Sequence, residues 1–202
     1  VKHGHQVFAV VGGGGEARRY ISVCRDIGLD EATSDEFGIL ITRINARLLI
    51  SALGDCAYPR VAESYLEAKE FALTGKIVVM GGVTPGQTTD AVAACLAEEM
   101  HAALMVNMTA IDGIYSADPK KDPAAVKYDT LSPQALIDLI MKEKLCAGSN
   151  MVIDLVAAKI TERSCIPLVV IDGRDPSLIG KALIDGEFNG TIVGEKIVTF
   201  PL

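Results

Sequence analysis

Apolar and polar positions along the chain fall into blocks that predict strands alternating with helices. Short apolar runs bounded by glycine or polar residues are typical of buried strands, whereas apolar residues three or four positions apart indicate a helix with one buried face. The runs that predict strands are residues 6–11, 77–80, 104–108, 168–171, 191–193 and 197–200. The segments that predict helices are residues 16–27, 35–53, 65–74, 90–100, 132–142, 151–163 and 177–184. This alternation predicts an α/β fold with a mostly parallel central sheet covered on both faces.

The longest predicted helix, residues 35–53, has an amphipathic pattern. The apolar side chains expected on one face of this helix are those of Phe37, Ile41, Ile44 and Leu48. Asp35 stands at its start, where a carboxylate can serve simply as the helix cap. Arg43 and Arg47 lie one turn apart, and we interpret them as a solvated or subunit-facing stripe rather than a site.

Three further polar residues are placed relative to predicted helices. Thr89 is expected to cap the helix that begins near residue 90, and Ser132 followed by Pro133 has the signature of a helix start. Asp154 is expected within an otherwise apolar helix, where a surface position is the simplest interpretation.

Composition indicates one globular domain with a large core. The chain has 202 residues, of which 50% are hydrophobic, and its mean hydropathy is +0.32. No apolar run approaches the roughly 20 residues needed to span a bilayer, and the N-terminus lacks the layout of a secretory signal. We therefore expect a soluble, cytoplasmic protein without a membrane partner.

Cysteine spacing and charge exclude other classes of function. The five cysteines are widely spaced and contain no CxxC pair, so neither a metal site nor a set of disulfides is expected. The net charge of −7 disfavours nucleic acid as a partner, because its phosphates demand a basic face. An acidic protein can still bind nucleotides, since local donors and a metal ion decide that contact.

The first candidate site is the run of four glycines from Gly12 to Gly15, which joins a predicted strand to a predicted helix. Such a turn presents bare backbone N–H groups to an anion, and Arg18 or Arg19 can reach a phosphate from the helix. Glycine also suits a tight turn for steric reasons alone. Gly12, Gly14 and Ala17 match a dinucleotide-binding fingerprint loosely, but the second strand ending in an acidic residue that this fingerprint expects is missing.

The second candidate site, residues 81–91, again follows a strand and precedes a helix. Its sequence, GGVTPGQTTDA, offers a Pro-Gly turn, three threonine hydroxyls, an amide and a carboxylate. Such a loop can surround a small polar ligand while the following helix N-terminus faces an anion. Helix capping alone accounts for Thr89 and Asp90, but it leaves the other polar residues without a reason.

The third candidate site, residues 107–123, follows a strand and combines tyrosine, carboxylates and lysines. Tyrosine can line a purine pocket, carboxylates can bind ribose hydroxyls or magnesium, and lysines can neutralise phosphate. A surface hairpin is the alternative, because Asp-Gly and Asp-Pro are ordinary turn signals. The residues concerned are Thr109, Asp112, Tyr115, Asp118, Lys120 and Lys121.

Three strand–loop–helix sites in this order resemble the amino acid kinase family, and the details resemble its UMP kinases of archaeal type. The similar segments are VVGGGGEARRY, DEFGILITRINARLL, VMGGVTPGQTTDAVAA, DGIYSADPKKDP, AAKI and FNGTIV. The resemblance covers essentially the whole chain. It implies a single amino acid kinase domain over residues 1–202 with a three-layer α/β/α sandwich. Members of the family begin with a further strand and helix, and this sequence begins at what would be their second strand.

The resemblance also implies a reaction and roles for individual residues. The reaction is ATP + UMP to ADP + UDP in pyrimidine nucleotide biosynthesis, with Mg²⁺ accompanying ATP, and the family usually assembles as hexamers. No residue is assigned as a metal ligand, and Asp90 would organise the groups around the transferring phosphoryl. The residues implied for UMP are Gly13, Asp35, Val83, Thr84, Pro85, Gly86, Gln87, Thr88 and Thr89. Those implied for ATP are Gly14, Arg18, Thr109, Tyr115 and Asp118.

Three other functions remain open. Another amino acid kinase would act on isopentenyl phosphate, carbamate or acetylglutamate. The polar loop at residues 83–89 argues against a substrate with an apolar isopentenyl group. A nucleotide-binding storage or sensor protein, similar to the molybdenum storage proteins, would bind ATP without turnover of UMP. A dinucleotide-dependent dehydrogenase is the third alternative.

Overall fold

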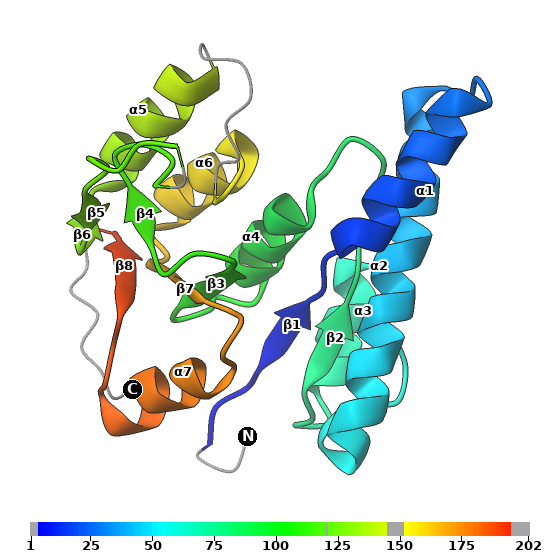
Figure 1. The fold of residues 1–202 in the computed structure, drawn as a ribbon. Helices are drawn as coiled ribbons and strands as arrows, with labels where there is room; N and C mark the ends of the chain where they lie inside the picture. Colours follow the sequence, from blue (N-terminus) through cyan, green and yellow to red (C-terminus); the bar gives the residue numbers. More distant parts are fainter. Residues whose placement is uncertain (1–3, 120, 145–151, 195–202) are drawn as a thin grey trace. The chain divides into compact units, whose positions relative to one another are not determined.

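The structure is a computed structural model that describes residues 4–119, 121–144 and 152–194 (Figure 1). The chain divides into two compact units, Val1–Leu96 and Ala97–Leu202, each described here by itself. Helices alternate with strands through both units, which confirms the predicted α/β class. The strand predicted at 197–200 lies outside the described residues, as does residue 151, where a helix was expected to begin.

The first unit is built on two parallel strands. Strand β1 pairs with β2 in the register Phe8↔Val78 to Val10↔Met80, so both strands end at the same edge. Its elements are β1 (Phe8–Val10), α1 (Gly14–Asp26), α2 (Glu31–Leu53), the 3₁₀ turn η1 (Gly54–Cys56), α3 (Tyr65–Ala72), β2 (Val78–Met80) and the start of α4 (Thr89–Glu99). A glycine-rich loop follows each strand, and the two loops therefore leave from one edge.

Helix α2 buries a different face from the one that its pattern of large apolar residues predicts. The buried side is a row of residues four positions apart, Ser34, Gly38, Thr42, Ala46 and Ile50. Small side chains there let neighbouring elements approach closely, since a β-carbon on Gly38 would lie 3.1 Å from Cδ1 of Ile21 on α1. Of the face expected to pack on the core, Phe37, Ile44 and Leu48 are exposed. The face of α2 that packs is therefore set by small side chains, which let neighbouring elements approach closely, more than by hydropathy.

The same helix meets a length and composition test for membrane spans. Within the described residues, one helix, Glu31–Cys56, is long and apolar enough to cross a bilayer, judged by length and composition alone. A packed helix of a globular protein passes the same test, so one such helix is weak evidence. Asn45 and Thr42 of α2 hydrogen bond to loops of the first unit, as expected of a helix packed within that unit.

The second unit contains a mixed four-stranded sheet in the order β3-β7-β8-β6. The pairs β3–β7 and β6–β8 are parallel, whereas β7–β8 is antiparallel. The strands are β3 (Met105–Thr109), β6 (Thr130–Leu131), β7 (Leu168–Asp172) and β8 (Gly190–Val193), and β4 (Ile114–Tyr115) pairs antiparallel with β5 (Lys127–Tyr128). The helices are α5 (Pro133–Lys144), α6 (Leu155–Ser164), α7 (Ser177–Gly180) and the π-helical turn η2 (Lys181–Asp185). Strands of two residues, such as β6, are too short to give a recognisable apolar run.

Two helix starts in this unit test the capping predictions. Ser132 Oγ accepts a hydrogen bond from the N–H of Ala135 at 3.1 Å, which confirms it as the cap of α5. Asp154 does not lie within the helix as expected, because this residue is the N-cap of α6. Its Oδ1 accepts from the N–H groups of Val156 at 2.6 Å and Ala157 at 3.1 Å. Val152 and Ile153 continue the apolar pattern that predicted a helix, but they precede the N-cap and lie outside the helix.

Candidate functional site

The first glycine-rich loop connects β1 to α1 with a backbone that requires glycine. Gly13 is the N-cap of α1, and no side-chain hydrogen bond caps the helix there. A β-carbon on Gly13 would lie 2.3 Å from Cβ of Ala17, so a larger residue would clash. Gly14 has a φ of +60°, a left-handed conformation that costs glycine little. The N–H groups of the first turn are thus presented without a capping side chain, which suits an anion.

The two arginines predicted near this loop differ in their surroundings. Arg19 pairs with Glu16, with 3.2 Å between Nη2 and Oε2, and its guanidinium lies 5.4 Å from the ring centre of Tyr20. Arg18 is exposed on α1, and in the described part of the chain no carboxylate pairs with it. Arg18 is therefore the better placed of the two to bind an external anion.

The second loop turns sharply at Pro85. The N–H of Gln87 donates to the carbonyl of Thr84 at 3.3 Å, and Gly86 between them has a φ of +79°. Proline followed by a glycine of positive φ is typical of a type II turn. The turn leaves the side chains of Thr84 and Gln87 exposed at the tip of the loop. They can donate and accept hydrogen bonds with a ligand there.

The residue that caps α4 is Thr88 rather than the expected Thr89. Oγ1 of Thr88 accepts from the N–H of Ala91 at 3.1 Å, whereas Thr89 is already the first residue of the helix. Oγ1 of Thr89 would lie 3.5 Å from a β-carbon on Gly12, which places the two glycine loops next to each other. Asp90 follows in the first turn of α4 and is half-buried. Because the two threonines are adjacent, the local sequence does not indicate which of them caps the helix.

Asp35 is bound to the second loop and is not a helix cap. The N-cap of α2 is Asp30, whose carboxylate accepts from the N–H of Thr33 at 2.9 Å, and the helix begins at Glu31. Asp35 lies about one turn further on. Its Oδ2 accepts from the N–H of Gly86 at 2.7 Å. The structure thus brings together residues that were assigned to the same ligand from two distant segments.

Three polar residues of α2 outside the predicted site residues also contact the glycine loops. Nδ2 of Asn45 donates to the carbonyl of Gly12 at 2.9 Å, and Oγ1 of Thr42 accepts from the N–H of Gly82 at 2.7 Å. Nε of Arg43 donates to the carbonyl of Gly82 at 3.3 Å, so this arginine is bound to a glycine loop rather than solvated, and a subunit-facing role for the stripe stays a prediction. These three polar residues lie close together in a mostly apolar helix, and this pattern in the sequence could have marked them as contacts of the loops.

In the second unit, the third candidate segment contains β4, which pairs with β5 just beyond the segment, and a polar cluster lies beside these strands. The hydroxyl of Tyr115 donates to Oδ1 of Asp112 at 2.8 Å, and Nζ of Lys127 lies 3.1 Å from its Oδ2. Thr109, at the end of β3, uses its hydroxyl locally in hydrogen bonds with the backbone of Ile111. The hairpin alternative and a polar site are therefore both compatible with this segment.

The charges of this cluster influence one another. Burial acts to raise the pKa of Asp112, but hydrogen bonds from Tyr115 and Lys127 outweigh it and hold that pKa below its ordinary value. The same hydrogen bond to Asp112 raises the pKa of Tyr115. Tyr115 therefore remains a neutral phenol beside an ionised carboxylate at neutral pH.

Asp118 lies beyond β4 in the polar turn. Its carbonyl accepts hydrogen bonds from the N–H groups of Lys121 and Asp122 at 3.0 and 2.9 Å. Nζ of Lys121 lies 3.9 Å from its Oδ2, a loose and mostly exposed ion pair. Lys120 lies outside the described residues.

The predicted site residues fall into two groups, one in each unit. Gly13, Gly14, Arg18, Asp35 and the segment from Val83 to Asp90 lie in the first unit, around the two glycine loops. The residues in the second unit are Thr109, Tyr115 and Asp118. That both groups serve one site remains a prediction.

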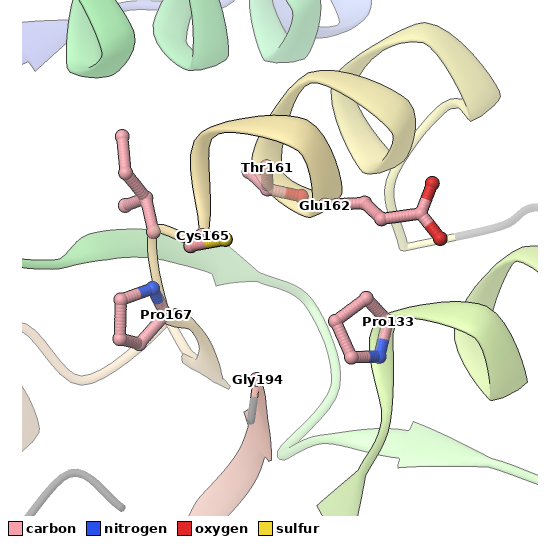
Figure 2. Close-up of a pocket in the computed structure, with 7 residues that line it drawn as sticks. Pro133, Thr161, Glu162, Cys165, Pro167 and Gly194 are labelled. Atoms are coloured by element: carbon pink, nitrogen blue, oxygen red, sulfur yellow. The ribbon is translucent and has the colours of Figure 1, made fainter. Parts of the chain in front are cut away.

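Figure 2 shows a separate hollow in the second unit, lined in part by Pro133, Thr161, Cys165 and Pro167. The hydroxyl of Thr161 is already bonded to the carbonyls of its own helix. None of the predicted site residues lines this hollow. In the described residues, no group of three or more His, Cys, Asp or Glu side chains is placed to hold a metal ion.

Comparison with known proteins agrees with this arrangement of loops and helices. The sequence profile of the amino acid kinase family matches residues 1–172. A uridylate kinase of Methanocorpusculum labreanum is 77% identical over 199 residues, which are 98% of this chain and 85% of that protein. A uridylate kinase of Methanoculleus marisnigri is 60% identical over 191 residues, 95% of this chain and 82% of that protein.

A solved structure gives the same result for the fold. The crystal structure of uridylate kinase from Archaeoglobus fulgidus superimposes with a TM-score of 0.84 at 50% identity, covering 95% of this chain and 86% of that chain. The chain belongs to the amino acid kinase family.

Proposed function

We propose that this chain is a UMP kinase that transfers the γ-phosphoryl group of ATP to UMP, giving ADP and UDP for pyrimidine nucleotide synthesis. Similarity to uridylate kinases over nearly the whole chain supports the assignment. The structural observation that carries it is the hydrogen bond between Asp35 and the N–H of Gly86. This bond holds the polar loop against α2, and Thr89 at the end of that loop lies beside Gly12 of the first glycine-rich loop. Such an arrangement suits a binding site for a nucleoside monophosphate.

UMP is assigned to the first unit. Its phosphate meets the N–H groups around Gly13, which no side chain caps, at the positive end of the α1 dipole. The loop from Val83 to Thr89, with Asp35, supplies donors and acceptors for the ribose and the base. The exposed polar tip of this loop supports a polar substrate as the phosphoryl acceptor, rather than an isoprenoid phosphate.

ATP is assigned to Gly14 and Arg18 in the first unit and to Thr109, Tyr115 and Asp118 in the second. Arg18 offers an exposed guanidinium for phosphate oxygens, which it can bind through two parallel hydrogen bonds. Tyr115, held by Asp112, offers an aromatic surface for the adenine. Asp118 offers a carboxylate for ribose hydroxyls.

The chemistry needs positioning and charge neutralisation rather than a base. An oxygen of the UMP phosphate is already anionic at neutral pH, so it attacks the γ-phosphorus in line without losing a proton. Backbone N–H groups and Arg18 stabilise the negative charge on the phosphoryl oxygens. Asp90, half-buried at the start of α4, orients the donors around the transferring group.

Mg²⁺ accompanies ATP in this proposal. The ion usually binds through substrate phosphates and waters together with one or two carboxylates, and no residue of this chain is assigned to it. When bound, it neutralises charge on the phosphate oxygens.

A homo-oligomer, a hexamer by analogy with the family, is proposed, with α2 as a surface that meets a second copy of the chain. Leu40, Ile44 and Leu48 are 54%, 55% and 65% exposed and lie one turn apart along the helix. Glu36 and Arg47 stand at opposite ends of this stripe, about three turns apart, and so point in similar directions. An antiparallel second α2 would place each Glu36 beside the partner's Arg47, a self-complementary pattern that two-fold symmetry requires.

A cytoplasmic location is also proposed. The described cysteines Cys24, Cys56, Cys95 and Cys165 are all free thiols, which supports a reducing compartment.

The proposed reaction is tested by ADP release from ATP and magnesium with each nucleoside monophosphate in turn. We expect turnover with UMP well above that with CMP, AMP or GMP. Asp90→Asn should lower kcat by about 100-fold or more while calorimetry shows UMP still bound, and Asp26→Asn, on the exposed end of α1, serves as the control. ATP binding without turnover of any monophosphate would favour a storage or sensor protein instead.

A further inference from the structure

Thr42 lies on the buried face of α2 between the two glycine loops of the first unit, and the residue is 6% exposed. Its Oγ1 accepts a hydrogen bond from the N–H of Gly82 at 2.7 Å. The same oxygen donates to the carbonyl of Ile39, 2.6 Å away in the preceding turn of α2. The bond to Ile39 fixes the direction of the hydroxyl, so the loop N–H meets an acceptor that is already oriented.

The two branches of the Thr42 side chain contact different loops. A β-carbon on Gly81 would lie 2.5 Å from Oγ1 of Thr42, so the second loop passes against the hydroxyl without room for a side chain. A β-carbon on Gly13 would lie 3.4 Å from Cγ2 of Thr42, so the methyl group faces the first loop. One stiff β-branched side chain therefore spans both loops.

We propose that Thr42 is a positioning residue that sets the separation of the two glycine loops and thereby the affinity and orientation of the bound UMP. The inference rests on the proposed function, in which Gly13 and the second loop hold that nucleotide. Thr42 does not need to touch the substrate, because it acts through the backbone of Gly82 and the close approach of Gly13. Displacing a reacting group by about 1 Å can cost 100-fold in rate, so this separation bears directly on phosphoryl transfer.

Thr42 is one of three α2 side chains that hold the glycine loops, and it lies between the other two along the helix. Asn45 holds the first loop through the carbonyl of Gly12, and Asp35 holds the second loop through the N–H of Gly86. Each of these two side chains is bonded to a single loop, whereas Thr42 lies against both. A change at Thr42 therefore alters the relation between the loops.

Two substitutions separate the two branches. Thr42→Val keeps the shape and removes the hydroxyl, whereas Thr42→Ser keeps the hydroxyl and removes the methyl group. Ser51→Ala is the matched control, because Ser51 is an exposed α2 residue whose hydroxyl donates to the carbonyl of Arg47 at 3.0 Å in its own helix. Calorimetry gives the Kd of UMP without ATP, steady-state kinetics give kcat and both KM values, and thermal unfolding reports the fold.

We expect Thr42→Val to raise the Kd and the KM for UMP about tenfold, as loss of one buried hydrogen bond predicts, with the KM for ATP changed less than twofold. Thr42→Ser should stay within about threefold of the unaltered protein, and Ser51→Ala should match it. UMP binding by Thr42→Val equal to that of the unaltered protein would overturn the inference. So would an equal loss for ATP and UMP together with a lower Tm in both Thr42 variants, since that indicates a purely structural role. Absence of UMP turnover in the unaltered protein would overturn the proposed function instead, and the UMP titrations would then still test Thr42.

Discussion

Three side chains of α2 hold the backbone of the loops that form the predicted UMP site. Asp35, Thr42 and Asn45 each bond to a backbone group far away in sequence, at Gly86, Gly82 and Gly12. The loops themselves are rich in glycine, which leaves their backbone many accessible conformations. Their conformation therefore depends on these hydrogen bonds.

Asp35 is the residue for which this dependence is most easily measured. Asp35→Asn removes a charge and weakens the acceptor for the N–H of Gly86, so the loop and any ribose contact at the carboxylate both weaken. We expect the KM for UMP to rise about tenfold or more, with the KM for ATP changed less than threefold, in steady-state assays.

Asp55→Asn is the control for that variant, because it removes a charge from an exposed position of η1, outside both the glycine loops and the proposed subunit contact. Its KM for UMP should equal that of the unaltered protein. Equal KM values for UMP in Asp35→Asn and Asp55→Asn would show that Asp35 does not belong to the UMP site.

At the scale of helices and strands, packing and capping set boundaries that periodicity only approximates. Helix α2 begins four residues before the predicted start at Asp35, since Asp30 satisfies the N–H of Thr33. Helix α6 begins four residues after the predicted start at residue 151, because Asp154 is its cap. In each case a carboxylate that binds free N–H groups decides where the helix starts.

The cap of α6 gives a prediction of stability. Asp154→Ala leaves the N–H groups of Val156 and Ala157 without their carboxylate partner, and we expect a loss of about 1 kcal/mol in the free energy of unfolding. Urea denaturation followed by circular dichroism measures this loss. Asp154→Ser retains a capping oxygen and should recover most of it. Equal losses for the alanine and serine variants would argue that the role of Asp154 is not capping.

In both units, carboxylates at or near the surface stabilise the folded state through hydrogen bonds and ion pairs. Bonds from Thr33 lower the pKa of Asp30, and Arg163 does the same for Glu98. The side chain of Arg174, with its backbone N–H, lowers the pKa of Asp172 to about 2. These groups lie in both units, so the effect of acid is distributed.

The direction of the pH dependence follows from these shifts. A carboxyl with a lowered pKa binds protons less readily when folded than when unfolded, so its stabilisation is present above the unfolded pKa near 4 and is lost as the pH falls through the folded pKa. We expect the Tm to decrease steadily from about pH 4.5 towards pH 2. Added salt should reduce the part of this decrease that comes from exposed ion pairs. A Tm that rises on acidification from pH 4.5 to pH 3 would contradict this assignment.

Assembly gives a second prediction for the molecule as a whole. Ile44→Glu puts a charge in the exposed stripe of α2, and we expect a smaller species by light scattering coupled to size-exclusion chromatography. Glu36→Arg and Arg47→Glu should each weaken association, and the double variant should restore it, because exchanging both charges recreates the pair. Failure of all these variants to change the mass would place the subunit contact elsewhere.

Several features of this protein follow from the sequence by itself. The α/β class, the positions of both glycine loops, the Pro-Gly turn and the cap at Ser132 were all predicted, and the structure confirms them. They depend on residues close together in the chain: on hydrophobic periodicity, on the left-handed freedom of glycine and on local capping bonds. The family, too, follows from local motifs in a fixed order.

Tertiary structure decided which polar side chains meet across the chain and which face of α2 is buried. The bond from Asp35 to Gly86 joins residues 51 positions apart, and the bond from Thr42 to Gly82 joins residues 40 apart. No local pattern marks such a pair, since each partner looks like an ordinary helix or loop residue. The small residues Gly38 and Ala46 are buried because other elements pack closely against them, while larger apolar residues of the same helix remain exposed. Long-range packing selects among faces and partners that the local sequence leaves equivalent, and this selection positions the candidate site.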